Sequence, residues 1–166
     1  SRPPEPVGRV CILFYRAHYL SGNTAVIDAL CAALRDRNLD PLPIFVSSLR
    51  DEAVQAELRE MFERQPIAVL LNTTGFSLAR LDAEEMTLDF WRSLDVPVLQ
   101  VILSGGTEDQ WRSEWRGLSP RDVAMNVALP EVDGRIITRA VSFKAANQRC
   151  DRLETDVVTY EPVSDR

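Results

Sequence analysis

The sequence predicts an α/β domain with a doubly wound, mainly parallel sheet of the Rossmann or flavodoxin type and a C-terminal antiparallel strand pair. Three observations lead to this prediction. Short apolar runs alternate with amphipathic segments through the first two thirds of the 166 residues, the connections between them are short, and two strand-like segments follow. Such alternation is typical of parallel strands joined by right-handed crossovers.

Four apolar runs of strand length carry the parallel part of the prediction. The first run, Val10–Tyr15, is almost continuously apolar, which is typical of a strand buried on both faces of a sheet. We expect these strands to lie in an order such as 2-1-3-4. The runs are Val10–Tyr15, Pro41–Ser48, Pro66–Asn72 and Val96–Leu103.

Helices are predicted between and after these strands from apolar spacing and from capping residues. Asn23 is expected to cap the first helix. The stretch Ser119–Asp122 has a complete helix-start pattern, with serine as cap, proline next and an acid at the third helical position, and Pro130 is expected to end that helix. The other predicted helices are Asp51–Arg64, Glu84–Leu94 and Thr107–Trp115.

The last part of the chain is predicted to form two strands between about Arg135 and Tyr160, separated by a polar loop that carries Cys150. We assign residues 1–8 to an N-terminal tail and 9–166 to a single α/β domain. The acids Glu131 and Asp133 precede Gly134. They could hold a cation, but we interpret them as solvated acids of an Asp-Gly turn.

Composition argues against several classes of protein. The net charge of -6 argues against a nucleic-acid surface, and no apolar run approaches the ~20 residues of a membrane span. Cys11, Cys31 and Cys150 are too few and too far apart for a disulfide framework or a zinc knuckle. We therefore expect a cytoplasmic protein with neither a nucleic-acid nor a membrane partner. Lys144 is the single lysine, which we attribute to codon bias.

Small polar turns follow the first, third and fourth predicted strands. The carboxyl ends of parallel strands lie at one edge of a sheet, so these turns are expected to border one crevice. Alternatively, they are only the caps and turn formers of short loops. The candidate substrate-binding residues are Tyr15, His18, Tyr19, Ser21, Gly22, Asn23, Thr73, Thr74, Gly75, Ser104 and Gly105, with Phe76 and Gly106 beside them.

None of these turns carries a nucleotide or metal motif. SGNTA lacks the GxGxxG spacing, and SGGTE lacks the Lys-Ser/Thr of a P-loop. His18 is the single histidine, and a lone imidazole does not make a metal site. We assign no metal ligand and no catalytic residue.

Several phrases, in this order, resemble one protein family: FYRAHYLSGNTAVIDAL, PLPIFVSSL, LNTTGFSLA, LDVPVLQVILSGG, GLSPRDVAMNVALPEVDGRI and TRAVSFK. From about Gly8 to Tyr160 the chain is similar to the family of the aerobic cobaltochelatase large subunit (CobN) and the porphyrin-binding H subunit of magnesium chelatase. The versions YRAHYLSGNTAVIDAL and NTTGFSLA are closer to the cobalt branch.

This resemblance implies ATP-dependent insertion of Co(II) into hydrogenobyrinic acid a,c-diamide, a corrin of cobalamin biosynthesis. It also implies that the large subunit carries the tetrapyrrole while two AAA+ partner subunits hydrolyse ATP. The segment would be an amino-terminal piece of that subunit, inactive alone and without its own cofactor. Its partners would be the remaining domains, the ATPase subunits and the corrin. The alternatives are an architectural domain that docks other domains, or the corresponding domain of the magnesium chelatase relative.

Overall fold

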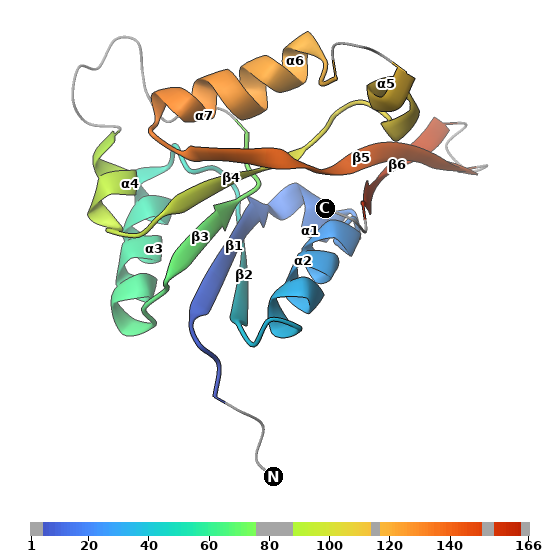
Figure 1. Cartoon of the computed structure of the whole chain (residues 1–166). Coiled ribbons are helices and arrows are strands. Elements are labelled where there is room, and N and C mark those ends of the chain that lie inside the picture. Colours follow the sequence, from blue (N-terminus) through green and yellow to red (C-terminus); the bar gives the residue numbers. More distant parts are fainter. Residues whose placement is uncertain (1–4, 76–87, 114–116, 151–154, 164–166) are drawn as a thin grey trace.

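Six strands form one mixed sheet in the order β2-β1-β3-β4-β5-β6 (Figure 1). The computed structural model describes residues 5–75, 88–113, 117–150 and 155–163, with only the backbone for residues 88–89, 146–150 and 155–158. The strands from β2 to β5 pair in parallel, and β6 is antiparallel to β5. The α/β class, the order 2-1-3-4 and the C-terminal antiparallel pair are therefore confirmed. The strands are β1 (Arg9–Tyr15), β2 (Asp40–Val46), β3 (Val69–Asn72), β4 (Val98–Leu103), β5 (Ile136–Cys150) and β6 (Thr155–Pro162).

The predicted boundary between the last two strands is wrong. Cys150 does not lie in a loop, because β5 continues to this residue and Cys150 pairs with Thr155 of β6. The polar composition after Lys144 suggested a loop. An antiparallel ladder satisfies the backbone groups of that stretch, and polar side chains are compatible with such a strand.

Helices cover both faces of the sheet because successive side chains of β1 point to opposite sides. Cys11 and Leu13 belong to a core with α3 (Glu52–Arg64) and α4 (Leu88–Ser93). Ile12 and Phe14 pack on the other side with Ile27 and Cys31 of α2 (Ala25–Arg35). Within the described residues, no helix has the length and apolar character needed to span a membrane.

The segment between β1 and α2 differs from the predicted simple turn. It contains a short helix, α1 (Arg16–Leu20), and the N-cap of α2 is Thr24. Asn23 does not cap the helix, because its Oδ1 instead accepts the backbone N–H of Tyr160 at 2.9 Å. A contact with a strand more than a hundred residues away therefore replaces the expected local cap.

A continuous helical rod precedes β5 and lies across the sheet (Figure 1). It consists of α6 (Pro120–Val123), the π-helical turn η1 (Ala124–Ala128) and α7 (Leu129–Val132), and it follows α5 (Glu108–Ser113). Ser119 caps it as predicted, accepting the N–H of Asp122 at 3.1 Å. Pro130 does not end the rod. The N–H of Leu129 donates to the carbonyl of Ala124, five residues earlier, which is the hydrogen bond of a π-helix. Pro130 follows directly and has no backbone N–H that could donate a hydrogen bond.

Polar side chains occupy the core where β3 and β4 end. Gln100 of β4 is fully buried, and its Oε1 accepts bonds from Asn72 Nδ2 and Arg135 Nη1, both at 2.8 Å. Its Nε2 donates to the carbonyl of Thr74 at 2.9 Å. Gln100 thus joins β3, the turn after β3 and the residue that precedes β5.

The buried guanidinium of Arg135 has a carboxylate partner. Its Nη2 lies 2.5 Å from Asp133 Oδ2, and it stacks on the Trp91 ring at 4.7 Å from the centroid. Burial lowers the pKa of Arg135, and the charge of Asp133 opposes that shift. The interpretation of Asp133 as a solvated acid is therefore wrong, because it is 4% exposed and paired.

We expect Gln100→Leu to lower the free energy of unfolding by about 3 kcal/mol. The apolar side chain removes one buried hydrogen bond each from Arg135, Asn72 and the Thr74 carbonyl, while the Arg135–Asp133 pair and the bond from Asn72 to the Thr74 carbonyl remain. Gln65→Leu is the matched control, because Gln65 is exposed and its replacement should change stability by less than about 0.5 kcal/mol. Urea unfolding monitored by circular dichroism measures both variants. Equal stability of the two would show that the network does not support the fold.

Candidate functional site

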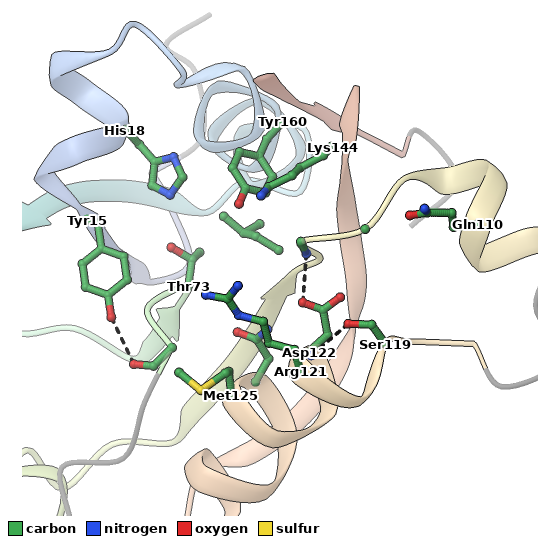
Figure 2. Close-up of a pocket in the computed structure, with 15 residues that line it drawn as sticks. Tyr15, His18, Thr73, Gln110, Ser119, Arg121, Asp122, Met125, Lys144 and Tyr160 are labelled. Carbon is green, nitrogen blue, oxygen red and sulfur yellow. Dashed lines mark hydrogen bonds between the residues drawn. The ribbon is translucent and has the colours of Figure 1, made fainter. Parts of the chain in front are cut away.

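A pocket of about 430 Å³ opens at the carboxyl ends of β1, β3 and β4 (Figure 2). The rod and the β5–β6 pair complete its walls. Such strand ends are where open α/β sheets hold ligands. The lining residues are Tyr15, His18, Thr73, Gly75, Leu103, Gly105, Gly106, Gln110, Ser119, Arg121, Asp122, Met125, Asn126, Lys144 and Tyr160.

Part of the predicted set lies on this pocket. All three predicted turns contribute to it, through Tyr15, His18, Thr73, Gly75 and Gly105. Gly106, which we placed beside the set, also lines it. The structure thus brings the three strand ends together, while their role in binding substrate stays a prediction.

The other predicted residues lie elsewhere. Thr74 and Ser104 are buried below the surface of the pocket, at 1% and 2% exposure. Asn23 bonds to the backbone of β6, and Phe76 lies outside the described residues. Exposed residues away from the lining complete the set: Tyr19, Ser21 and Gly22.

Tyr15 forms the wall at the end of β1. Its hydroxyl donates to the carbonyl of Gly75 at 3.2 Å and so links β1 to the turn after β3. Burial raises the pKa of Tyr15, while Thr74 and the charge of Arg135 act in the opposite direction. Thr73 makes a second link, because its hydroxyl donates to Leu13 O at 2.9 Å.

His18 and Tyr160 meet edge to face above the pocket, with ring centroids 5.3 Å apart. Burial lowers the pKa of His18, so the imidazole is neutral at pH 7. Burial raises the pKa of Tyr160, and the nearby Asp122 carboxylate adds to that rise. Both rings therefore offer neutral hydrogen-bonding groups to the pocket.

Asp122 fixes the turn after β4. Its carboxylate accepts the Ser104 hydroxyl at 2.8 Å and the Gly105 N–H at 2.9 Å. A Cβ at residue 105 would lie 3.2 Å from Asp122 Oδ1, so this close approach favours glycine. The acid predicted to begin a helix thus also anchors a strand end.

The backbone donors of this turn are used inside the protein. The Gly106 N–H donates to Ser104 Oγ at 3.1 Å, and the Thr107 N–H donates to Gln110 Oε1 at 3.0 Å. With the Gly105 N–H on Asp122, the SGGT turn has no free cradle of N–H groups for a phosphate.

The cations of the pocket come from the last third of the chain, which sequence reasoning did not assign to the site. Arg121 lies on α6 and Lys144 on β5. The Lys144 Nζ is 5.9 Å from the centroid of the Tyr160 ring. Two sequence signals could have indicated these residues: Arg121 lies within the helix-start pattern, and Lys144 is the single lysine.

The arrangement can hold a polar ligand through side chains. Tyrosine hydroxyls, an imidazole, an arginine and a lysine surround an opening whose volume lies within the usual range of ligand sites. In the part of the chain that the structure describes, no three His, Cys, Asp or Glu side chains gather as metal ligands would.

A family model described as CobN/Magnesium Chelatase matches residues 2–166. The chain belongs to the CobN/magnesium chelatase family. Aerobic cobaltochelatase subunit CobN of Pseudomonas aeruginosa is 46% identical over 91% of this chain, and CobN of a Sinorhizobium species is 44% identical over 98%. The magnesium-chelatase relative of Rhodobacter capsulatus, its H-type subunit, is 34% identical over 80% of the chain and 11% of its own length.

Part of one solved structure has a similar fold. The catalytic subunit of cobaltochelatase from Mycobacterium tuberculosis superposes with a TM-score of 0.80 and 30% identity, over 99% of this chain and 14% of that chain. The present chain spans 12% of the length of both CobN relatives. The comparisons therefore concern one portion of a much longer subunit.

We expect Asp122→Ala to release the turn after β4. The Ser104 hydroxyl and the Gly105 N–H lose a charged acceptor, so the free energy of unfolding should fall by about 2 kcal/mol. Amide exchange at Gly105 should become at least about tenfold faster, which heteronuclear NMR measures. Asp36→Ala, at an exposed acid after α2, is the control and should leave this exchange unchanged. Unaltered Gly105 exchange in Asp122→Ala would contradict the anchoring role.

His18 should make the protein less stable at acid pH. Because burial lowers the pKa of His18, its imidazole is protonated at a lower pH in the folded chain than in the unfolded chain. Protonation of His18 therefore favours unfolding. The contribution of His18 is complete above its usual pKa of about 6.5 and is lost as the pH falls towards its depressed folded pKa. Unfolding free energies of wild type and His18→Gln between pH 7.5 and 5 test this, with wild type losing more.

The single imidazole gives an independent measurement, because its NMR titration needs no assignment among histidines. A midpoint at or above the usual histidine value would contradict the burial effect.

Proposed function

We propose that this chain is a domain of the large subunit of an aerobic cobaltochelatase, which inserts Co(II) into hydrogenobyrinic acid a,c-diamide in cobalamin biosynthesis. The observation that carries the proposal is the identity of 44–46% to CobN subunits over at least 91% of the chain. Identity to the magnesium-chelatase relatives is 30–34% over about 80% of the chain. This difference favours the cobalt branch over the magnesium branch.

In this proposal the pocket at the strand ends contacts the edge of the corrin. Hydrogen-bonding groups from Tyr15, His18 and Tyr160 meet the cations Arg121 and Lys144 around one opening. These groups suit the carboxylates and amides that surround a corrin ring. A volume of about 430 Å³ suits one edge of such a macrocycle with its side chains.

The remaining steps are assigned to other parts of the enzyme. Two AAA+ partner subunits hydrolyse ATP, cobalt is a substrate of the assembled complex, and the segment alone is inactive and binds no cofactor. This division is consistent with the SGGT turn, whose N–H groups are bonded internally. We place the complex in the cytoplasm. The strand order 2-1-3-4-5 supports assigning the sheet to the doubly wound flavodoxin type.

A second candidate function is architectural, in which the domain docks another part of the large chain. The observation that favours it is an exposed apolar group on α1 and β2. Tyr19 stacks on Phe45 at 5.0 Å between centroids, and the two side chains are 57% and 45% exposed. Leu20 is 72% exposed. Exposed aromatic and aliphatic side chains of this kind are common at interfaces.

A substitution that fills the pocket separates the two functions. Met125 lines the pocket from the rod, whereas Val123 of the same rod is 42% exposed and outside the lining. We expect Met125→Trp to weaken binding of the metal-free corrin at least about tenfold, because the indole occupies its volume. Val123→Trp should bind like wild type.

Titration of the chain with the corrin, followed by visible absorbance, measures both variants, and thermal unfolding checks that both are folded. Equal corrin affinity of the two variants would exclude this pocket as the corrin contact and favour the architectural function.

A further inference from the structure

Arg121 and Lys144 are the two basic residues that line the pocket. Several arginines pair with carboxylates, as in Arg9 with Asp40 at 2.7 Å and Arg135 with Asp133. Among the described residues, no carboxylate lies within 4.0 Å of Arg121 or Lys144. Two cations that border one pocket in an acidic protein are thus available to an outside anion.

The acid in the pocket does not neutralise them. Asp122 is 5% exposed, and its two oxygens accept the Ser104 hydroxyl and the Gly105 N–H. His18 and the two tyrosines are neutral at pH 7, for the reasons given above. The charged side chains that line the pocket at pH 7 are therefore two cations and one internally bonded carboxylate.

The two cations reach the pocket from different elements. Lys144 and Tyr160 are opposite one another in the β5–β6 ladder, while Arg121 extends from the rod. Figure 2 shows the Arg121 guanidinium and the Tyr160 hydroxyl directed into the same hollow from opposite sides, with Lys144 beside Tyr160. An anion placed there can take charge-assisted hydrogen bonds from both walls.

We propose that Arg121 and Lys144 form a carboxylate subsite, through which the pocket selects a free acid over an amide at one position of the corrin periphery. The inference rests on the proposed function, which leaves the identity of the contacted group open. Carboxylate fits better than phosphate, because the donors that face the ligand are side chains and the N–H groups of the turn are used.

Amide discrimination follows from charge. A neutral amide carries an acceptor oxygen but no net charge, so it loses the charge-assisted part of both bonds and adds N–H donors that face two cations. The expected preference for the acid is at least about tenfold for one such group, since bonds to charged groups contribute about twice as much as neutral ones.

The direct test compares two metal-free corrins, one with free peripheral carboxylates and one fully amidated. Wild type should bind the acid at least about tenfold more tightly. Lys144→Met and Arg121→Gln should each weaken acid binding about tenfold and leave amide binding unchanged. Arg139→Gln removes the same charge from an exposed position of β5 outside the lining, so it should retain the preference of wild type.

A second readout uses the single lysine. Reductive methylation with ¹³C-formaldehyde keeps the charge of Lys144 and places an NMR reporter inside the pocket, while the methylated N-terminus is recognised by its lower pKa. Glutarate should shift the Lys144 methyl signal in a saturable manner, and Arg121→Gln should weaken this effect. Inorganic phosphate at equal concentration should shift the signal less.

The outcomes separate the inference from the proposed function. If wild type binds both corrins equally, the carboxylate subsite is wrong while corrin binding stands. If neither corrin binds, the proposed corrin contact fails, and the methyl titration alone decides whether a carboxylate subsite exists. An unshifted Lys144 signal, or a stronger response to phosphate than to glutarate, overturns the subsite.

Discussion

The side-chain amide of Gln100 joins the elements from which the floor of the pocket is built. It bonds to Asn72 of β3, to the carbonyl of Thr74 and to Arg135, which directly precedes β5. All of these groups are buried, so each would be costly without its partner. The position of the turn after β3 is therefore fixed by the same contacts that connect three neighbouring strands, and Tyr15 then bonds to Gly75 of that turn.

Asp122 plays the corresponding part on the other side of the opening. Its carboxylate connects the rod to the end of β4, which draws the helix start and the glycine turn together. This use of the acid has an electrostatic consequence, because a carboxylate with two donors inside the protein has less capacity to pair with Arg121 or Lys144. Internal satisfaction of the buried polar groups thus leaves the positive charge at the surface of the pocket.

The parallel sheet could be predicted because local signals specify it. The strand order and the cap at Ser119 depend on residues close together in the sequence, and both were confirmed. The second strand is a partly exposed edge strand, and the connection after β1 contains an additional helix. The roles of Asn23 and Asp133 could not be read in this way. Their side chains fit a helix cap and a solvated turn equally well, and the partners that decide otherwise, Tyr160 and Arg135, come from tertiary structure.

The pocket was predicted in part for the same reason. Strand ends such as Tyr15 and Gly105 follow from topology, since parallel strands share an edge. Lys144 and Tyr160 lie on an antiparallel pair, and their position depends on register shifts where β5 pairs with β4 and β6. Such register shifts change which side chains face the pocket, and they cannot be predicted from the amino-acid composition of the strands.

Two segments that are far apart in the sequence meet beside this pocket. The bond between Asn23 and Tyr160 spans 137 positions, and His18 contacts the Tyr160 ring beside it. The wall of the pocket that carries Lys144 and Tyr160 is consequently formed only when β6 pairs with β5 and Tyr160 contacts the loop after α1. A ligand that bridges Arg121 and Lys144 would bind this closed arrangement and not the unfolded chain. By mass action such binding raises the free energy of unfolding, by about 2.7 kcal/mol at a ligand concentration of 100 times Kd. Ligand binding at the pocket and folding of the β5–β6 pair onto the sheet are thus linked.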